Sequence, residues 1–583
     1  MLIIGLNAYH GDASAAAIVD GRLVAAAEEE RFTRVKHAAG FPAHALRYVL
    51  EAVGASPREI DLIAVARDPW ARILRKVLYA LRMPARAAGR LGVQGRFATI
   101  GAEAGRALGA AGAGFEVRRV EHHLAHLASS FLVSPFEEAA LFSIDGLGDF
   151  ASAMWGVGRG GKIEPWGAVA FPHSLGIYYT ALTQYLGFPR YGDEYKVMGL
   201  ASYGEPEMLD EFRRIVTAPG GGRMGFALNP DYFLHHRSTA DMTWDAGEPA
   251  IGRLYSDRVV ERLGPARDAA EPIGERHHAI AASMQRRLEE VVLDNLSSLR
   301  RATGMRNLCL AGGVAYNCVT NGKILAATGF EQVYIQSAAG DAGLAIGAAM
   351  QAWHRAGAHP REFVMEHAYW GAQYSDAEIA ALLERAGGEI ERQGCVIRKI
   401  EIEPELLSLV ASEIAKGKVV GWFQGRMEWG PRALGNRSIL ADPRRAEMRE
   451  ILNTKIKRRE AFRPFAPSIL EDKVPEYFTQ SHPSPFMLMA YSVRPEKRAV
   501  IPATTHIDGS GRLQTVNERQ NPLYFGLIRE FDRQTGVPVL LNTSFNENEP
   551  VVQKPEEALD CFLRTRMDLL AMGSYVITRE ALN

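Results

Sequence analysis

A strand–loop–hairpin pattern occurs twice in this chain. In the first copy, an apolar run at 2–6 is followed by Asp12-Ala13-Ser14-Ala15 and by the turn Asp20-Gly21. In the second copy, the apolar run 139–144 is followed by Asp149-Phe150-Ala151-Ser152-Ala153 and by Arg159-Gly160-Gly161-Lys162. Asp-Gly between apolar runs is typical of a tight hairpin turn. Because both copies place an acid and small residues directly after a buried strand, the pattern predicts a duplicated α/β unit.

A third loop is rich in glycine and follows the apolar run 308–310. Its sequence, Ala311-Gly312-Gly313-Val314-Ala315-Tyr316-Asn317, predicts a glycine turn that leads into a helix. Backbone N–H groups and the helix dipole at such a turn can hold an anion, so Gly312, Gly313 and Asn317 are candidate phosphate-binding residues. Related loops clamp nucleotide phosphates between two lobes in the superfamily of actin, sugar kinases and heat-shock ATPases.

Two histidines, His122 and His126, stand four residues apart before the second apolar strand. On a helix they leave the same face and can bind one metal ion, although capping or surface pairs show the same spacing. Asp145 and Asp341 end separate apolar runs, as expected for ligands that converge at open strand ends, and Asp341 could instead be an N-cap. Together the four residues would form a mixed N/O metal site.

His10 follows the first apolar strand and precedes Asp12. One interpretation makes His10 an ordinary turn residue. The other makes it a base that faces a cleft, because an imidazole with a pKa of about 6.5 can accept a hydroxyl proton.

The C-terminal part of the chain has a different composition. A boundary is expected near 353–378, which predicts a first domain at 1–355, a linker at 356–400 and a second domain at 401–583. Arginines such as Arg432 and Arg463 stand beside Trp, Pro, Phe and Gly rather than among acids. They could be solvated surface, but clustered Arg and Lys near Ser and Asn favour a pocket for a phosphate or carboxylate.

The composition limits the choice of partners. With 67 Lys and Arg against 68 Asp and Glu, the 583-residue chain has no net field to hold nucleic acid or a membrane. The four cysteines show no zinc-binding spacing, and no apolar run is long enough to span a membrane or act as a signal peptide. A cytoplasmic protein is expected. The basic stretch 72–96 favours an amphipathic surface helix over a membrane or nucleic-acid element.

These motifs together resemble the O-carbamoyltransferase family that includes the nodulation-factor, cephamycin and tobramycin carbamoyltransferases. The matching stretches run nearly from end to end of the chain, in the expected order. They are His10-Gly-Asp-Ala-Ser-Ala, Glu28-Glu-Glu-Arg-Phe with Lys36-His37, His122-His-Leu-Ala-His126, Asp145-Gly-Leu-Gly-Asp149, Glu194 to Gly204, Ala311 to Asn317, Gly340-Asp-Ala-Gly343, Trp429 to Ser438, Arg459 to Pro467, His506-Ile-Asp508 with Arg512, and Leu541-Asn-Thr-Ser-Phe-Asn546.

The resemblance implies an α/β enzyme of two domains. The N-terminal domain would have an actin-like ATPase fold, which is a duplicated ribonuclease H-like fold, and the C-terminal domain would be YrdC-like. In such enzymes the C-terminal domain converts carbamoyl phosphate and ATP to carbamoyl-AMP, with Mg²⁺ a further candidate alongside ATP. The N-terminal domain then transfers the carbamoyl group to an acceptor hydroxyl and releases AMP.

The resemblance also assigns roles to residues. His122, His126, Asp145 and Asp341 would be the metal ligands, for Fe²⁺ first and Mn²⁺ or Zn²⁺ as alternatives. His10 would be the base, with Asp12 beside it, and Asp231 would orient the acceptor. This chain departs from the family pattern in one respect: Gly11 separates His10 from Asp12, whereas many relatives have the His and Asp adjacent. The pocket for carbamoyl phosphate and the adenylate would comprise Arg432, Lys457, Arg463, Arg512 and Ser544, with Asn542 and Asn546 as neighbours.

Other functions fit the sequence less well. A hydrogenase-maturation carbamoyltransferase would carry an acylphosphatase domain and zinc-finger cysteines, and near-zero net charge argues against tRNA as a substrate. A non-catalytic actin-like scaffold leaves the predicted ligands without a role, and a small-molecule kinase leaves the second domain unexplained. The acceptor is expected to be a hydroxyl-bearing small molecule, such as a natural product. Its identity stays open, as does the oligomeric state, a homodimer included.

Overall fold

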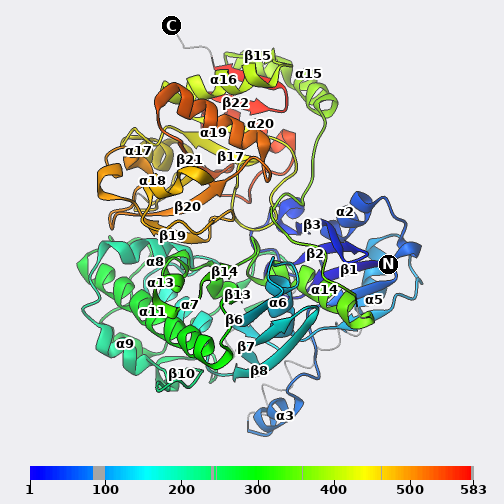
Figure 1. Ribbon diagram of the computed structural model, residues 1–583, viewed down its shortest axis with the longest axis vertical. Coiled ribbons are helices and arrows are strands. Elements are labelled where there is room, and N and C mark those ends of the chain that lie inside the picture. Colours follow the sequence, from blue (N-terminus) through cyan, green and yellow to red (C-terminus); the bar gives the residue numbers. More distant parts are fainter. Residues whose placement is uncertain are drawn as a thin grey trace. The chain divides into compact units, whose positions relative to one another are not determined.

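The computed structural model describes residues 1–82, 97, 99–237, 242–243, 246–357, 359–460 and 462–579 (Figure 1). The chain divides into two compact units, Met1–Met365 and Glu366–Asn583.

Unit 1 begins with a five-stranded sheet. Its strands are β1 (Leu2–Asn7), β2 (Ser14–Val19), β3 (Arg22–Glu28), β4 (Leu62–Val65) and β5 (Val117–Arg119), in the order β3-β2-β1-β4-β5. Strands β1, β2 and β3 form an antiparallel meander, and β4 and β5 continue the sheet in parallel with β1. The predicted first hairpin is therefore present, with its turn at Asp20-Gly21.

A second sheet of unit 1 repeats this arrangement. It contains β6 (Glu138–Gly148), β7 (Ala151–Arg159), β8 (Lys162–Ala170), β13 (Asn307–Ala311) and β14 (Gln332–Tyr334), in the order β14-β13-β6-β7-β8. Strands β6, β7 and β8 are antiparallel, whereas β13 and β14 are parallel to β6, so order and directions match the first sheet. The duplicated α/β unit that the sequence predicts is confirmed.

Helices α6 (His122–Phe131) and α14 (Leu344–Ala356) lie between the two sheets of unit 1 (Figure 1). Glycines allow this close packing. A Cβ at Gly5 of β1 would lie 1.8 Å from the carbonyl oxygen of Ala345, and one at Gly347 would lie 1.9 Å from that of Ala125. Any side chain at either position would push α14 away from its neighbours.

The other helices of unit 1 surround this central pair. They are α1 (Glu30–Thr33), α2 (Ala43–Val53), α3 (Ile73–Arg82), α5 (Ile100–Ala107), α7 (Leu175–Tyr185), α8 (Glu194–Leu200), α9 (Leu209–Ile215), α10 (Asp257–Leu263), α11 (Glu275–Thr303), α12 (Cys318–Asn321) and α13 (Ile324–Thr328). Two short ribbons complete the unit, β9 (Val216–Thr217) with β10 (Ala227–Leu228) and β11 (Met242–Thr243) with β12 (Ala250–Ile251).

Unit 2 is built on one mixed sheet of nine strands, in the order β15-β23-β22-β16-β17-β21-β18-β20-β19. The strands are β15 (Cys395–Lys399), β16 (Val420–Phe423), β17 (Arg437–Ala441), β18 (Ala466–Leu470), β19 (Met489–Ser492), β20 (Ser510–Val516), β21 (Val539–Ser544), β22 (Leu569–Met572) and β23 (Tyr575–Arg579). The helices are α15 (Asp376–Arg392), α16 (Glu403–Ala415), α17 (Met448–Ile451), α18 (Val474–Tyr477), α19 (Pro522–Thr535) and α20 (Pro555–Thr565).

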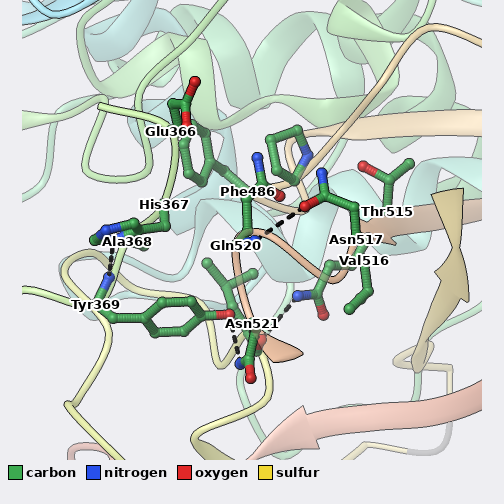
Figure 2. A pocket seen from close by; sticks show the side chains of 13 residues that line it. Glu366, His367, Ala368, Tyr369, Phe486, Thr515, Val516, Asn517, Gln520 and Asn521 are labelled. Carbon is green, nitrogen blue, oxygen red and sulfur yellow. Dashed lines mark hydrogen bonds between the residues drawn. The ribbon is translucent and has the colours of Figure 1, made fainter. Parts of the chain in front are cut away.

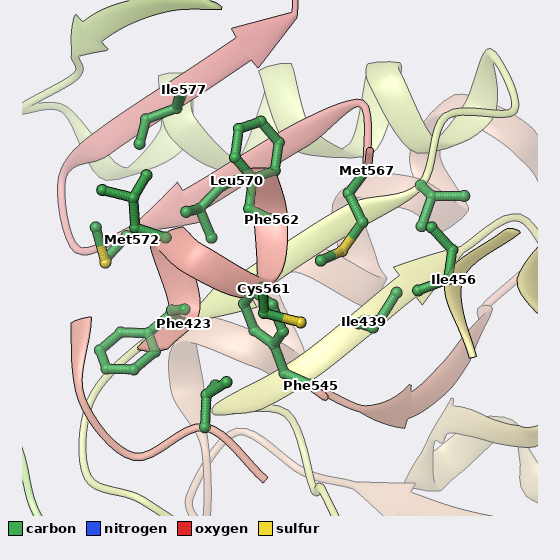
Figure 3. Packing of buried hydrophobic residues seen from close by; sticks show 14 of the residues in the cluster. Phe423, Ile439, Ile456, Phe545, Cys561, Phe562, Met567, Leu570, Met572 and Ile577 are labelled. Atoms are coloured by element: carbon green, nitrogen blue, oxygen red, sulfur yellow. The ribbon is translucent and has the colours of Figure 1, made fainter. Parts of the chain in front are cut away.

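The core of unit 2 forms where α20 covers the sheet. Cys561 and Phe562 of the helix pack with strand residues such as Phe423, Ile439 and Leu570 (Figure 3). Burial of apolar side chains between a helix and a sheet is the main stabilising contribution in such a layer. The unit is thus the second α/β domain that the sequence predicts.

The predicted linker at 356–400 differs from the structure in its second half. Helix α15 and strand β15 fall within it, and β15 pairs antiparallel with β23. Helix α15 starts in a capping box, in which Ser375 Oγ accepts from Glu378 N and the Glu378 carboxylate accepts from Ser375 N. The sequence obscured this helix because its narrow apolar stripe is surrounded by polar residues.

The four cysteines, Cys309, Cys318, Cys395 and Cys561, are buried and free. Burial raises the thiol pKa of Cys309 and of Cys561 to about 12. Among the described residues, no helix has both the length and the apolar content needed to cross a membrane.

Candidate functional site

Three separate elements deliver the predicted metal ligands to one point in unit 1. His122 and His126 lie on the first turns of α6, where the Glu121 side chain caps the helix by accepting from Leu124 N at 2.7 Å. Asp145 lies near the end of β6, and Asp341 begins the short helix at Asp341–Gly343 before α14. All four side chains are buried. The predicted convergence of these residues is present in the structure.

The four side chains form a tight cluster, with one potential ligand atom from each within 4.8 Å of the others. His122 Nε2 lies 3.2 Å from Asp145 Oδ2, and His126 Nε2 lies 3.4 Å from Asp341 Oδ1. Within the part of the chain that the structure describes, both ring nitrogens of His126 and Asp341 Oδ1 are buried without a hydrogen-bond partner. Buried polar atoms are rarely left unsatisfied, and two imidazoles with two carboxylates suit a divalent transition metal. The residues therefore fit a metal ion.

The electrostatics of the cluster lead to the same conclusion. Burial lowers the pKa of His126, but the nearby carboxylates of Asp145 and Asp341 outweigh burial and raise the pKa to about 9. The pKa values of Asp145 and Asp341 lie well below their usual range, because the surrounding histidines outweigh the opposing effect of burial. Both carboxylates of the cluster are therefore anionic, and a metal ion would displace a proton from His126.

Backbone groups hold these ligands in place. Gly313 N donates to Asp145 Oδ1 at 2.7 Å, and His122 N donates to Asp149 Oδ2 at 3.0 Å. A Cβ on Gly148 would lie 2.1 Å from the His122 ring, so β6 can pass the histidine only with glycine there. Hydrogen bonds to ligating side chains fix their orientation and raise metal affinity.

His10 adjoins the cluster. Its Nδ1 lies 2.5 Å from Asp341 Oδ2, and its ring centroid lies 5.5 Å from that of His122. Burial lowers the pKa of His10, but Asp341 outweighs burial and the pKa is raised. His10 is therefore not an isolated turn residue, because its ring lies against the cluster of candidate metal ligands.

Asp12 faces a different partner. Its Oδ1 lies 2.7 Å from His37 Nδ1, and its backbone has a φ of +56°, which a non-glycine residue rarely adopts. Gly11, the departure from the family pattern, lies against Tyr191, whose hydroxyl oxygen would be 2.7 Å from an added Cβ. Gly11, between His10 and Asp12, therefore lies where the backbone packs closely against Tyr191.

The glycine loop after β13 contacts a predicted metal ligand, and its role as an anion site stays a prediction. Gly312 has a φ of +96°, and an added Cβ would lie 2.1 Å from the carbonyl oxygen of Ile144. The N–H of Gly313 already donates to Asp145. Asn317 caps α12 by accepting from Thr320 N, and its amide donates to Gln285 Oε1 at 2.8 Å. The loop thus supports a predicted metal ligand.

Asp231, the predicted acceptor-orienting residue, does not join the metal cluster. It lies exposed on the short helix Pro230–Tyr232, where it pairs with Arg237 at 2.9 Å.

In unit 2, Lys457 is buried and contacts the end of β21. Its Nζ donates to the carbonyl oxygens of Ser544 and Asn546, at 2.5 Å and 2.7 Å, and to Asn546 Oδ1 at 2.7 Å. Burial, together with the nearby Arg459 and Arg463, lowers the pKa of Lys457 well below its usual value. Three of the predicted pocket residues are thus in direct contact.

A second group of predicted residues lies along neighbouring strands. The Asn542 amide nitrogen lies 3.0 Å from both Ser468 Oγ and Gln514 Oε1, and 3.2 Å from the carbonyl oxygen of Ala433. Arg512 lies two residues before Gln514 on β20, so both side chains leave the same face of the sheet. Ala433 follows Arg432. The topology therefore gathers Arg432, Arg512 and Asn542, although they are distant in sequence.

The loop that carries Arg432 is organised by Glu428, which the sequence analysis did not single out. One oxygen of this buried carboxylate accepts the backbone N–H groups of Leu434, Asn436 and Arg437, at 2.7, 2.9 and 3.2 Å. Arg437 itself is buried and donates to carbonyl oxygens, including that of Gln424 at 2.5 Å. Arg437 therefore braces the loop.

Charged or polar side chains lie beside two of the predicted pocket arginines: Glu460 lies near Arg463, and His506 lies near Arg512. Arg463 lies 3.3 Å from Glu460. Burial, with the charges of Arg449 and Arg512, outweighs Asp508 and lowers the pKa of His506 to about 4. His506 is therefore neutral at pH 7, with the Arg449 and Arg512 guanidinium groups and the Asp508 carboxylate around it.

Family models match both units. The model described as Carbamoyltransferase N-terminus matches residues 2–87 and 104–350, and the model described as Carbamoyltransferase C-terminus matches residues 411–579.

The chain belongs to the carbamoyltransferase family.

Relatives of this carbamoyltransferase are similar over most of their length. Nodulation protein NolNO of Sinorhizobium fredii is 38% identical, over 98% of this chain and 80% of that protein. Nodulation protein NolO of Bradyrhizobium diazoefficiens is 39% identical, over 79% of each chain. An uncharacterized protein of Synechocystis is 39% identical, over 99% of this chain and 97% of its own length.

Solved structures match at a lower level. The crystal structure of T. kodakarensis HypF covers 61% of this carbamoyltransferase and 47% of that chain, with 16% identity and a TM-score of 0.30. Similarity this weak supports no functional conclusion.

A pocket of the second unit lies beside the Arg432 loop. Its lining includes Tyr369, Leu434, Phe486, Gln514 and Asn521 (Figure 2). Tyr369 Oη donates to the carbonyl oxygen of Leu434 at 2.9 Å, and Gln514 Nε2 donates to the same oxygen at 2.8 Å. Gln514 also contacts Asn542, so the pocket shares a hydrogen-bond network with the predicted adenylate residues.

Asp12 belongs to a second group of polar side chains, whose other members, Glu30 and His37, had no role assigned from the sequence. One potential ligand atom from each of Asp12, Glu30 and His37 lies within 4.8 Å of the others. Burial lowers the pKa of His37, but Asp12 and Glu30 outweigh burial and raise it to about 9. Glu30 and His37 lie in stretches that resemble the family, and this resemblance could have marked them as functional candidates. Their spacing in the sequence did not show that both lie near Asp12.

Proposed function

We propose that this carbamoyltransferase is an ATP-dependent O-carbamoyltransferase with one half-reaction in each unit. In unit 2, water cleaves carbamoyl phosphate to carbamate and phosphate, and the carbamate oxygen attacks the α-phosphorus of ATP to give carbamoyl-AMP and pyrophosphate. In unit 1, an acceptor hydroxyl attacks the carbamoyl carbon, AMP leaves, and the hydroxyl proton passes to a base. The acceptor is a small molecule with a free hydroxyl, and a natural product fits this class.

The observation that carries the proposal is the buried cluster of His122, His126, Asp145 and Asp341 with His10 beside it. A divalent metal held by these four residues would polarise an oxygen of the carbamoyl adenylate. Fe²⁺ is our first choice, and the ligand set also suits Mn²⁺ and Zn²⁺. We assign His10 as the base: Asp341 lies against its Nδ1, so the hydroxyl proton would be taken at Nε2.

Unit 2 supports the adenylation step. Arg432, Arg463 and Arg512 supply guanidinium groups that suit phosphate oxygens. Lys457 holds the backbone at Ser544 and Asn546, and the Asn542 network joins this region to the pocket beside Leu434. Mg²⁺ could accompany ATP here. A carbamoyl phosphate is a poor donor to a neutral alcohol, so activation as the adenylate explains why two sites occur in one chain.

The first experiment follows the adenylation step alone. Purified protein is incubated with ATP and carbamoyl phosphate without any acceptor, and pyrophosphate and carbamoyl-AMP are measured, the latter by mass spectrometry. We expect wild type and His126→Ala to form carbamoyl-AMP, whereas Arg512→Ala should form at least about 100-fold less, because a charged hydrogen bond to a developing phosphate charge is lost.

Arg533→Ala is the matched control, since Arg533 is exposed and pairs only with Glu530 among the described ion pairs. It should behave like wild type. If pyrophosphate release does not depend on carbamoyl phosphate, the proposed reaction is wrong. If His126→Ala abolishes adenylation as fully as Arg512→Ala does, the assignment of one half-reaction to each unit is wrong.

A further inference from the structure

Helix α3 of unit 1 exposes an unusual concentration of large apolar side chains. Of the twelve exposed large hydrophobic residues among the described positions, six lie between 70 and 81. Trp70 is 69% exposed, Leu74 78% and Leu81 75%. Figure 1 shows α3 at the periphery, outside the two sheets of the unit. A contiguous apolar surface of this kind usually marks an interaction site.

The opposite face of α3 fixes the helix to the unit. The Tyr79 ring packs edge-on against Phe150 and Phe171, with centroid distances of 5.7 Å and 5.1 Å. Arg72, just before the helix, pairs with Glu121 at 2.6 Å, and Lys76 Nζ donates to the carbonyl oxygen of Pro69 at 2.8 Å. The orientation of the helix is therefore determined by contacts, and its apolar face points away from them.

The apolar residues form a single stripe. Ile73, Leu74, Val77, Leu78 and Leu81 recur with the spacing of one helix face, and all five are exposed. Arg75 lies exposed at the margin of this stripe, and Trp70 lies just before the helix. A cationic amphipathic helix with a tryptophan at one end has the composition of helices that lie in the plane of a membrane interface.

The local charge around α3 indicates which kind of partner it would bind. Between Asp68 and Glu103 the sequence has seven basic residues and no acid, although the whole chain has a net charge of −1. Three of the seven, Arg86, Arg90 and Arg96, lie outside the described residues. The even balance over the whole chain had suggested that there is no membrane partner, but it averages out this local excess. An anionic surface is complementary to it.

A second copy of the chain fits this surface less well. The ten residues of α3 span about 15 Å, and a face about 10 Å wide offers on the order of 150 Å². A stable protein interface needs roughly 800 Å² per partner. A two-fold contact through α3 would also bring the basic margins of both copies together.

We propose that α3 docks the protein onto the anionic surface of a phospholipid bilayer, with Leu74, Leu78 and Leu81 inserted below the headgroups and Arg75 among them. The proposal concerns a reversible surface attachment and does not depend on the proposed reaction. It places the attachment point next to the β6–β7 turn, since Tyr79 packs on Phe150 of that turn.

The test is co-sedimentation of the full-length protein with vesicles. One set contains phosphatidylcholine alone, and the other contains phosphatidylcholine mixed with phosphatidylglycerol. We expect binding to the anionic vesicles that weakens as salt is raised. The triple variant Leu74→Gln/Leu78→Gln/Leu81→Gln should bind at least about tenfold less, because it removes the inserted apolar surface.

The matched control is Ile402→Gln/Ile507→Gln, which alters two exposed apolar residues of unit 2 and should leave vesicle binding unchanged. Thermal unfolding by circular dichroism checks that both variants are folded. Equal binding by wild type and the triple variant would overturn the proposal, as would no binding of wild type to anionic vesicles. A triple variant that dissociates an oligomer in size-exclusion chromatography, with no vesicle binding by wild type, would assign the stripe to self-association instead.

Discussion

At the residue scale, the most informative side chains are buried polar groups whose partners among the described residues do not satisfy them. His126 is fully buried, and both its ring nitrogens lack hydrogen bonds while two anionic carboxylates lie 3.4 Å and 3.7 Å from Nε2. A proton on His126 compensates this charge in part. A divalent cation would compensate it fully and would give each ligand atom a bond.

Removal of this ligand should therefore reduce metal binding strongly. We expect His126→Ala to lower the affinity for Mn²⁺, measured by calorimetric titration, by at least roughly 100-fold, more than the loss of a supporting hydrogen bond would cause. The control is His44→Ala, because His44 is half-exposed and contacts Glu29 rather than the cluster. Equal Mn²⁺ affinity in both variants would contradict the assignment of His126 as a ligand.

The pair of His37 and Asp12 predicts a pH dependence of stability. The pKa of His37 rises from 6.5 to about 9 on folding, because Asp12 and Glu30 outweigh burial. A group with a raised pKa contributes its full stability below pH 6.5 and loses it as pH rises through about 9. Since the side chain is 29% exposed, solvent screens the pair, and we expect a loss of about 1–2 kcal/mol.

Urea unfolding at several pH values measures this effect. The free energy of unfolding of wild type should fall between pH 6.5 and 9 relative to that of His37→Gln, which has no titrating group at this position. A constant difference between the two proteins across this range would show that His37 does not carry the proton in the folded state.

At the scale of secondary-structure elements, glycines set how closely the ligand-bearing segments approach. Gly148 lets β6 pass the His122 ring, and Gly312 lets the loop after β13 pass the carbonyl oxygen of Ile144. Gly146 lies in the same Asp145-Gly-Leu-Gly stretch, yet an added Cβ there would meet no atom within 4 Å. The two glycines of one motif therefore have different structural demands.

This difference gives a matched pair of variants. Gly148→Ala should displace the His122 ring and lower Mn²⁺ affinity by roughly 10–100-fold, because the ligand loses its fixed orientation. Gly146→Ala should bind Mn²⁺ like wild type. The readout is calorimetric titration, with circular dichroism to confirm folding. If both variants bind alike, Gly148 does not position His122.

Elements also show what the sequence could and could not predict. Strands at 2–6, 139–144 and 308–310 were predictable, because each is a continuous apolar run bounded by turn residues. Helix α15 was not, because its buried face is a narrow stripe. The hydrogen bond from Gly313 N to Asp145 could not be predicted either, because the two residues meet only through the parallel pairing of β6 and β13.

At the scale of the whole molecule, the chain has two units with separate cores and separate candidate sites. A ligand that binds only one folded unit stabilises that unit by mass action. We therefore expect two unfolding transitions in differential scanning calorimetry, each responding to its own ligand.

Mn²⁺ should raise the midpoint of one transition, and carbamoyl phosphate with a non-hydrolysable ATP analogue should raise the other. At about 100 times the dissociation constant, each shift should be roughly 5–10 °C. His126→Ala should abolish only the first shift, and Arg512→Ala only the second. A single transition that both ligands shift would show instead that the units unfold as one.

The sequence by itself determined the duplicated α/β architecture, the second α/β domain and the identity of the four clustered residues in unit 1. The duplicated unit and the candidate ligands follow from local signals: apolar runs, turn residues, and two histidines four apart on a helix. The α/β character of the second domain is what the resemblance to the family implied. Only the tertiary structure decided what each residue contacts. In the folded chain, His10 contacts Asp341 and Asp12 contacts His37. Gly313 N donates to Asp145, and the apolar face of α3 is exposed. Such contacts join residues far apart in the chain, so their geometry depends on strand register and helix packing, which no local pattern encodes.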